Sequence, residues 1–478
     1  MEEQSEIKSL ILEELYADTD PPDQNAGTER ALLPEQIPAL PAPAAESTAQ
    51  AEPEASLCAP VQLEKAEPLP DEEVTRHTTA LWKYLPVPAE EPEPFLEYLT
   101  RETEIPGGRV IAARVRGKKH KHEGTNCDDW FEITSAGEAT VIAVSDGAGS
   151  KKFSRIGARD ACRAAAGYLS CALADVLEGE LSGDVRLPLS DAKCQKACGV
   201  LAGIVQQAVL KAYEAVEAAC YTRAADPVYT AALGRRPDVK DFAGTLLLAA
   251  LLPVDGECLA VSCQVGDGMI ALLNTAGPFD TSLRLMGEAD SGSFSGETEF
   301  LTSESVRTLD ALRSRTRIFR GEADCLLVMT DGVADDYFPF EPGLYRLCFD
   351  LVANGILPGR GPALSLSGLS QQQVRLFKKL PDSLGYPWVN DPSVEISLHY
   401  TERICQAAGL SLRDLWEDET PLLLSRLELD GRMEAASPAE RLKIWLDNYV
   451  VRGSFDDRTL VAVHLPAADR ECPAVTEG

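Results

Sequence analysis

The apolar residues of the chain form two kinds of pattern, one typical of buried strands and one typical of amphipathic helices. Residues 154–177 and 190–221 repeat apolar residues with the 3.6-residue period of a helix, and Ser154 is the expected N-cap of the first. Apolar runs predict strands at 109–115, 141–145, 242–252, 258–265, 269–273, 317–320, 325–329 and 459–465. Long helices that follow strands predict a helical layer packed on a sheet.

Polar and glycine-rich segments separate these elements. Residues 117–124 read Gly-Lys-Lys-His-Lys-His-Glu-Gly and are expected to form a polar loop, and residues 277–300 an exposed loop or flap. The long segment between Asp331 and the last predicted strand has a helical pattern over much of its length. Residues 337–440 are therefore interpreted as a largely helical segment.

The N-terminal residues 1–75 differ in composition from the rest of the chain. Acidic residues far outnumber basic ones there, proline and alanine are frequent and aromatic residues are few. Such a segment buries too little apolar area to offset the entropy of ordering, which predicts a disordered tail. One amphipathic helix around Ile7 to Leu15 is the alternative for its first part. The expected organisation is this tail, a folded domain at 76–466 and a C-terminal tail at 467–478.

Charge and cysteine content exclude several classes of protein. The 478 residues include 45 Lys and Arg against 76 Asp and Glu, and no basic stripe marks a nucleic-acid binder. The 13 cysteines contain no Cys-x-x-Cys pair, which favours reduced thiols over a disulfide framework or a zinc site. The start lacks the features of a signal peptide, and the longest apolar run, 245–254, is too short to cross a bilayer. We expect a soluble, cytoplasmic protein without a membrane partner.

Five acidic sites stand at the ends of predicted strands or next to glycine. They are Asp128-Asp129, Asp146-Gly147, Gly266-Asp267-Gly268, Asp331-Gly332 and Asp456-Asp457. A single Asp-Gly pair is more often a turn than a ligand. Five at strand ends instead favour a hard divalent cation bound through oxygen. Two such ions about 3.5 to 4 Å apart can activate a bridging water and clamp the oxygens of an in-line displacement at phosphorus.

The order of these motifs resembles the metal-dependent protein phosphatase (type 2C) family of Ser/Thr phosphatases. The motifs that carry the resemblance are Asp146-Gly-x-Gly149, Gly244-Thr245, Gly266-Asp267, Thr330-Asp331-Gly332 and Asp456-Asp-x-Thr459. Gly117-Lys-Lys-His120 and Cys127-Asp-Asp-Trp-Phe131 are most similar to the bacterial branch. The resemblance covers residues 109–465. It implies that 76–466 is a phosphatase-like catalytic domain and that the helical segment at 337–440 is an insertion in it. It implies an α+β fold, a four-layer α/β/β/α sandwich of two antiparallel sheets flanked by helix pairs.

The resemblance also implies a set of metal ligands, either Mg²⁺ or Mn²⁺. Asp146 would bridge two ions, the carbonyl of Gly147 would bind the second, and Asp331 and Asp456 would complete the shell of the first. Asp129 stands where the family holds metal-bound water, and Asp128 takes the place of its usual Glu or Gln neighbour. Asp267 and Asp335 would form the weaker third-metal site found in many members. Gly244 and Thr245 are interpreted as structural.

The implied reaction is hydrolysis of phosphoserine or phosphothreonine by direct attack of a metal-bridging hydroxide, with no phosphoenzyme. A cysteine-phosphatase mechanism lacks its parts, because no cysteine stands in a His-Cys-x5-Arg loop. Phosphorylated Ser/Thr proteins are the implied substrates, and a cognate Ser/Thr kinase is a further candidate partner.

Two residues of the better-known eukaryotic members are absent. The histidine proposed to protonate the leaving group is replaced by Ala148, and the arginine that grips the phosphate is replaced by Gly124. Lys119 or His120 of the basic segment could replace this arginine, although a solvated basic loop is the competing interpretation. Lysine or histidine would bind phosphate less specifically than an arginine fork.

Three hypotheses remain at this point. The first is an active metal-dependent Ser/Thr phosphatase. The second is a weak or inactive phosphatase-like module that binds phosphoproteins or a kinase, which the replacements at Ala148 and Gly124 favour. Retention of all the predicted carboxylates argues against it, because clustered charge destabilises an empty site. The third, a structural acidic protein, explains the tail but not the ordered motifs.

Overall fold

The structure is a computed structural model, and it describes residues 83–179, 181–289, 298–358, 401, 405, 409–417, 436–448 and 455–465. The expected tails at 1–75 and 467–478, the helix around Ile7 to Leu15 and most of the insertion at 337–440 lie outside the described residues.

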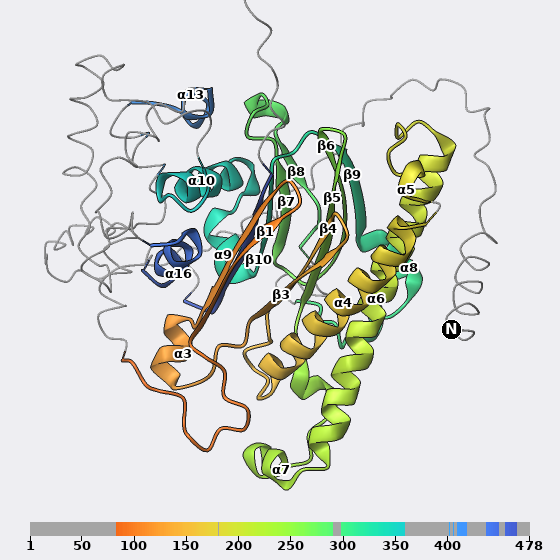
Figure 1. The fold of residues 1–478 in the computed structure, drawn as a ribbon. Helices are drawn as coiled ribbons and strands as arrows, with labels where there is room; N and C mark the ends of the chain where they lie inside the picture. The colour runs from red at the N-terminus through yellow and green to blue at the C-terminus, as the bar shows by residue number, and fades with distance from the viewer. Residues whose placement is uncertain are drawn as a thin grey trace, which may run out of the picture. The chain divides into compact units, whose positions relative to one another are not determined.

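Two antiparallel sheets form the centre of the fold (Figure 1). The first has six strands in the order β1-β2-β11-β10-β7-β8. These strands are β1 (Tyr98–Ile105), β2 (Gly108–Val115), β7 (Met269–Leu273), β8 (Leu283–Leu285), β10 (Cys325–Met329) and β11 (Arg458–His464). Every residue of β7 and β10 is buried, as expected of central strands that are covered on both faces.

The second sheet has five strands in the order β3-β4-β5-β6-β9. They are β3 (Trp130–Ala136), β4 (Ala139–Ser145), β5 (Leu246–Val254), β6 (Glu257–Val265) and β9 (Thr316–Gly321). Asp255 and Gly256, with φ of 49° and 84°, join β5 to β6. Two consecutive residues with positive φ suit a two-residue hairpin turn.

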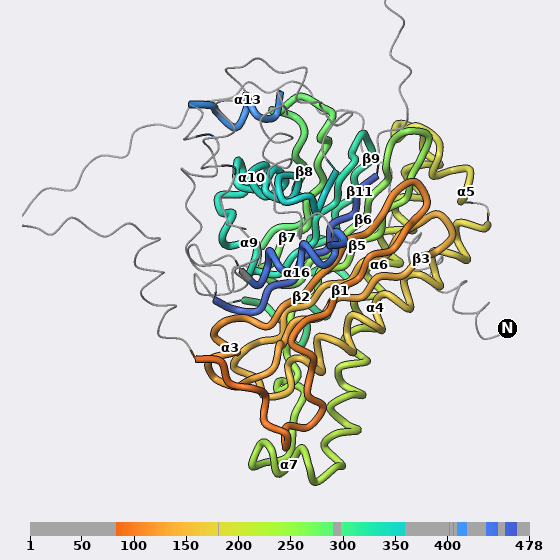
Figure 2. Tube along the Cα trace, turned by 60° about the vertical axis from the view of Figure 1, so that its left-hand side comes forward, coloured from red at the N-terminus to blue at the C-terminus, as the bar shows by residue number. Residues whose placement is uncertain are grey.

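Helices cover the outer face of each sheet (Figures 1 and 2). Against the second sheet lie α4 (Ser154–Leu177) and α6 (Ala192–Ala224). Three shorter helices pack against this pair, α5 (Leu181–Asp184), α7 (Pro227–Leu233) and α8 (Leu309–Arg315). Against the first lie α9 (Asp331–Ala334), α10 (Phe340–Ala353) and α16 (Pro438–Asn448), and α13 (Leu412–Glu417) packs on α10. Short 3-10 turns are η1 (Val239–Phe242), η2 (Phe279–Thr281), η3 (Glu304–Val306) and η4 (Asp335–Tyr337). The predicted α+β fold with four layers is confirmed.

Three apolar clusters hold these layers together. The middle cluster joins the facing sides of the two sheets, with Val144, Leu247, Val328 and Val461 among its members. A second cluster joins the second sheet to α4 and α6, and a third joins the first sheet to α10, α13 and α16. Each of these interfaces buries apolar area on both sides, which is the main favourable contribution to folding. None of the helices in the described part of the chain has both the length and the apolar character needed to span a bilayer.

Some elements differ from the prediction. The loop expected at 117–124 is wrong, because Lys118–Glu123 form a helical turn, α3, that ends at Gly124 with φ of 75°. The flanking glycines, interpreted as loop boundaries, instead delimit a short helix whose His120 is buried. The strand β1 precedes the first predicted strand. Its Arg101, Glu102 and Glu104 side chains interrupt the apolar pattern because β1 is an edge strand.

The predicted N-cap of the first long helix is also wrong. Ser154 is the first residue of α4 and Phe153 precedes it as N-cap. The Ser154 hydroxyl donates to the carbonyl of Lys151 at 2.8 Å instead of accepting from a free amide. The second long helix begins at Ala192, where the carboxylate of Asp191 accepts from the amide of Lys193.

Candidate metal centre

The acidic sites meet at one end of the sandwich because of the strand pairing. Asp129 precedes β3 and Asp146 follows β4, and these strands pair Trp130 with Ser145. Asp331 follows β10 and Asp456 precedes β11, and Met329 of β10 pairs with Leu460 of β11. Met329 also pairs with Met269, which places the turn that carries Asp267 at the same end.

Three of the predicted ligands form a compact cluster. Carboxylate oxygens of Asp146, Asp267 and Asp331 lie within 4.8 Å of one another. Two hydrogen bonds from Thr245 fix the Asp146 backbone. The Thr245 amide donates to the Asp146 carbonyl at 2.8 Å, and the Thr245 hydroxyl accepts a hydrogen bond from the Asp146 amide at 2.8 Å. Gly244 forms an isolated antiparallel bridge with Gly147. These contacts agree with the structural role expected for Gly244 and Thr245.

Asp129 is fully buried, and its carboxyl group contacts that of Asp146. Its Oδ2 accepts hydrogen bonds from the hydroxyls of Thr330 at 3.0 Å and Thr459 at 2.6 Å. Within the described part of the chain, no N–H or O–H group donates to its Oδ1. The Oδ1 of Asp267 is also buried and without a donor among the described residues. Buried acceptors of this kind fit a cation, because an unsatisfied buried oxygen is costly.

Crowding of these carboxyl groups changes their proton affinity. Burial, together with the charge of Asp457, raises the pKa of Asp129 to about 7. Burial and the neighbouring Asp267 raise the pKa of Asp331 to about 8, and burial and Asp331 raise the pKa of Asp146 well above its usual value. A divalent cation would offset this repulsion and keep the carboxylates ionised.

Asp457, to which the sequence analysis assigned no role, forms a second, buried centre next to Asp456. Its carboxylate accepts from the amides of Gly117 at 2.6 Å and Asp128 at 2.5 Å. The Nδ1 of His120 lies 2.9 Å from its Oδ2, while the Nε2 lies 3.3 Å from Oδ1 of Asp456. Burial by itself would lower the pKa of His120, but the Asp457 charge outweighs it and raises the pKa to about 10. The Asp-Asp pair at the start of β11 is the signal that could have pointed to this contact.

The two basic candidates for phosphate binding differ in exposure. His120 is 3% exposed, and its Nδ1 is also 2.7 Å from the carbonyl of Asn126. The Lys119 side chain is 48% exposed, and its Nζ lies 3.8 Å from Oδ2 of Asp456. A Cβ built on Gly149 would be 4.0 Å from this Nζ, so Lys119 lies beside the Asp146-Gly-x-Gly149 turn. Lys119 therefore combines positive charge, exposure and proximity to the carboxylates.

The remaining candidates occupy the margins of the cluster. Asp128 is 7% exposed, and burial and Asp457 raise its pKa to about 8. Asp335 is exposed as a whole residue at the start of η4, but its carboxyl group is partly buried, and this burial and the charge of Asp267 raise its pKa. Ala148 is buried and donates its amide to the carbonyl of Ala243 at 3.0 Å, so it offers no acid to a leaving group.

The sequence model of the family described as protein phosphatase 2C matches residues 116–354, half of the chain. The chain belongs to the protein phosphatase 2C family. It is a protein Ser/Thr phosphatase of this metal-dependent family, and phosphorylated Ser/Thr proteins are the substrates of such enzymes. A comparison with curated protein sequences gives no match.

Several solved structures of phosphatases are similar to this protein phosphatase 2C member at low identity. One is a magnesium complex of RsbX, with 10% identity, a TM-score of 0.29 and coverage of 77% of this chain and 100% of the other. Another is the Ser/Thr phosphatase Stp1 from Staphylococcus aureus, with 10% identity, a TM-score of 0.31 and coverage of 76% and 98%. A third is the catalytic domain of the phosphatase PstP with two manganese ions, with 13% identity, a TM-score of 0.30 and coverage of 77% and 98%.

Proposed function

We propose that this phosphatase hydrolyses phosphoserine and phosphothreonine in proteins by direct attack of water at phosphorus, without a phosphoenzyme. The observation that carries the proposal is the convergence of carboxylate oxygens of Asp146, Asp267 and Asp331, with the buried Asp129 beside Asp146. Carboxylates that converge in this way repel one another, and such a cluster is suited to divalent cations.

The proposed cofactors are two Mg²⁺ or Mn²⁺ ions, with a third at a weaker site. Asp146, Asp331, Asp456 and the carbonyl of Gly147 would hold the first two, with Asp129 beside Asp146, and Asp267 with Asp335 the third. When bound, such ions supply an activated water and compensate charge on the phosphoryl oxygens.

The protein itself would orient these groups and bind the substrate. Thr330 and Thr459 hold Asp129 through its Oδ2, which would leave its Oδ1 available to a cation. We assign the phosphate contact to Lys119 and a positioning role to His120, because both ring nitrogens of His120 already contact Asp456 or Asp457. Lys119 would bind the phosphate as a point charge, in place of the bidentate arginine contact of other members.

The surroundings of Cys127, the cysteine of the Cys127-Asp-Asp-Trp-Phe131 motif, do not support a cysteine nucleophile. Cys127 is fully buried, and burial and the charge of Asp457 raise its pKa well above the usual value. A thiol that stays protonated is a poor nucleophile. Water therefore remains the nucleophile of choice.

The test is hydrolysis of a phosphothreonine peptide with Mn²⁺, with Mg²⁺ and with chelator. We expect metal-dependent turnover by the wild type, and loss of at least about 100-fold in Asp146→Asn and Asp331→Asn, because each removes a charged ligand. Asp310→Asn is the matched control, because the Asp310 side chain is 90% exposed on α8. Turnover that survives chelation or the Asp146 substitution would contradict the proposal. Binding of the peptide or of a kinase without turnover would favour the alternative, a phosphatase-like binding module.

A further inference from the structure

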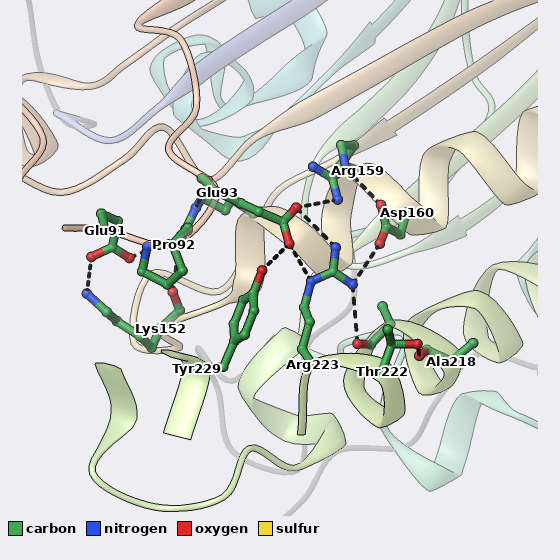
Figure 3. A network of polar contacts seen from close by, with 12 residues as sticks. Glu91, Pro92, Glu93, Lys152, Arg159, Asp160, Ala218, Thr222, Arg223 and Tyr229 are labelled. Carbon is green, nitrogen blue, oxygen red and sulfur yellow. Dashed lines mark hydrogen bonds and ion pairs between the residues drawn. The ribbon is translucent and has the colours of Figure 1, made fainter. Parts of the chain in front are cut away.

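Residues 83–97, called the strap below, lie outside the sheets and helices. The strap has no regular secondary structure, and four of its residues are prolines, Pro86, Pro88, Pro92 and Pro94. It runs next to α4 and the ends of α6 and α7, where Figure 3 shows its polar contacts.

Glu93 fastens the strap to three helices. Its carboxylate accepts from Nε and Nη2 of Arg223 on α6, at 2.6 and 3.0 Å, and from Nη2 of Arg159 on α4 at 2.9 Å. The hydroxyl of Tyr229 on α7 donates to the same carboxylate. Figure 3 shows these groups converging on Glu93. Glu93 has φ of 49°, a backbone conformation that a side chain other than glycine adopts only when its surroundings hold it there.

The strap next holds the first turn of α4. The buried guanidinium of Arg155 donates from Nε to the Glu93 carbonyl at 3.1 Å and from Nη2 to Oε1 of Glu91 at 3.0 Å, and also donates to the Pro92 carbonyl. Arg155 directly follows Ser154, the first residue of α4. The position of Ser154 is thus coupled to the strap by a fully buried side chain.

The strap also holds the segment that leads to Asp128 and Asp129. The amide of Phe95 donates to Oδ1 of the buried Asn126 at 2.8 Å, and the Phe95 ring packs edge-on against Trp130 with centroids 5.1 Å apart. The carbonyl of Asn126 in turn accepts a hydrogen bond from Nδ1 of His120. Asn126 and Trp130 therefore fix both ends of the Cys127–Asp129 segment.

These two anchored segments form the walls around Gly147. A Cβ built on Gly147 would lie 2.6 Å from the carbonyl oxygen of Asp128 and 3.0 Å from Cβ of Ser154, so only glycine fits between them. The strap ties one wall through Asn126 and the other through Arg155. Its position therefore sets the width of the slot that holds Gly147 and the adjacent Asp146.

We infer that Glu93 is a positioning residue for the metal centre, acting through the strap on the two walls of the Gly147 slot. The inference rests on the proposed function for the identity of the metal centre. Loss of the Glu93 contacts would release the strap, widen the slot and misalign Asp146 and Gly147 without removing any group of the centre.

The test is calorimetric titration of Mn²⁺ into the wild type, Glu93→Ala and Arg223→Met, without substrate. We expect about tenfold weaker Mn²⁺ binding in each variant, in the range found for groups that orient metal ligands. The double variant should bind Mn²⁺ no more weakly than Glu93→Ala, because Arg223 acts on the strap through Glu93. Glu90→Ala, which removes an exposed glutamate of the same strap, should bind Mn²⁺ as the wild type does.

The outcomes separate the inference from the proposed function. Unchanged Mn²⁺ affinity in folded Glu93→Ala, verified by circular dichroism, would overturn the inference, since a purely structural role would lower only stability. If Glu93→Ala does not fold, Asn126→Ala supplies the same measurement on the opposite wall. Mn²⁺ binding without phosphatase turnover in the wild type would count against the proposed function alone, whereas no Mn²⁺ binding by the wild type would overturn both.

Discussion

Lys119 is an exposed positive side chain at a site otherwise built from carboxylates. Its Nζ is 3.8 Å from Asp456, close to where a substrate phosphate would approach the cluster. We expect Lys119→Met to raise KM for a phosphothreonine peptide about tenfold, with kcat changed little, because the charge contributes equally to ground-state and transition-state binding.

Steady-state kinetics of Lys119→Met and Lys119→Arg distinguish charge from packing. Arginine should restore KM, because it keeps the charge. Lys211→Met is the control, since Lys211 is paired with Glu214 on the surface of α6. An unchanged KM in Lys119→Met would assign phosphate binding to another group.

Glu93 should give the stability of the protein a measurable acid dependence. Burial by itself would raise the pKa of Glu93, but hydrogen bonds from Arg223, Tyr229 and Arg159 outweigh it and lower the pKa from 4.5 to about 2. The stabilisation is therefore fully present above the unfolded pKa of 4.5 and is lost as the pH falls toward 2. Asp160, which pairs with Arg159 and Arg223, is the other acidic group facing this cluster.

Urea unfolding of Glu93→Gln against the wild type measures this contribution. We expect a loss of about 2 kcal/mol in the free energy of unfolding at pH 7, of the order found for hydrogen bonds to charged groups. The difference should shrink as the pH is lowered below 4.5, where Glu93 of the unfolded wild type becomes protonated. A difference that grows toward low pH would have the wrong sign and would exclude this role.

At the scale of elements, α3 explains why the chain does not carry the family arginine at residue 124. Gly124 ends α3 in the left-handed conformation, with φ of 75°, and its amide donates to the carbonyl of His120. A Cβ at this position would also lie 3.4 Å from the carbonyl of Pro86 in the strap. Glycine is therefore required by the backbone of α3, independent of the chemistry of the site.

Gly124→Ala should lower the free energy of unfolding by about 1 kcal/mol, the usual cost of a side chain in this conformation. Gly199→Ala is the control, and it should raise the free energy of unfolding. Gly199 is exposed inside α6, where alanine favours the helix and a Cβ would meet nothing within 4 Å. Denaturant titration of the two variants measures both effects. Equal behaviour of the two variants would show that α3 does not need glycine at its end.

At the scale of the whole molecule, the metal centre joins both sheets. Asp129 and Asp146 come from the second sheet, while Asp331 and Asp456 come from the first. Ions held between them would therefore link the two central layers in addition to their role in chemistry. Binding to the folded state alone stabilises a protein by about 2.7 kcal/mol when the ligand is present at 100 times its Kd.

We therefore expect Mn²⁺ to raise the Tm by several degrees and excess chelator to reverse the shift. Thermal unfolding monitored by calorimetry tests this, and Asp331→Asn should remove most of the shift because it removes a ligand from the first sheet. Asp310→Asn should retain it. A Tm independent of Mn²⁺ would mean that the centre is not filled under these conditions.

Much of the fold is determined locally and could be predicted. The strands Met269–Leu273 and Cys325–Met329 and the helix Ser154–Leu177 coincide with their predictions, because continuous apolar runs and 3.6-residue periodicity record burial directly. The acidic strand ends could be recognised for the same reason, since an apolar strand that stops at Asp-Gly indicates where the chain leaves the core. The order of these motifs along the chain was then sufficient to indicate the family.

Other features depended on contacts between distant segments. Asp457 and His120 are 337 positions apart, and no spacing in the sequence shows that the carboxylate holds the histidine ring and two backbone amides. The strap was equally hidden, because a proline-rich segment has no periodicity that marks burial. The sequence by itself determined the layers and the set of carboxylates. Only the tertiary structure decided which charged groups meet. The energy of a charge pair depends on its distance and burial, and strand register and helix packing set both.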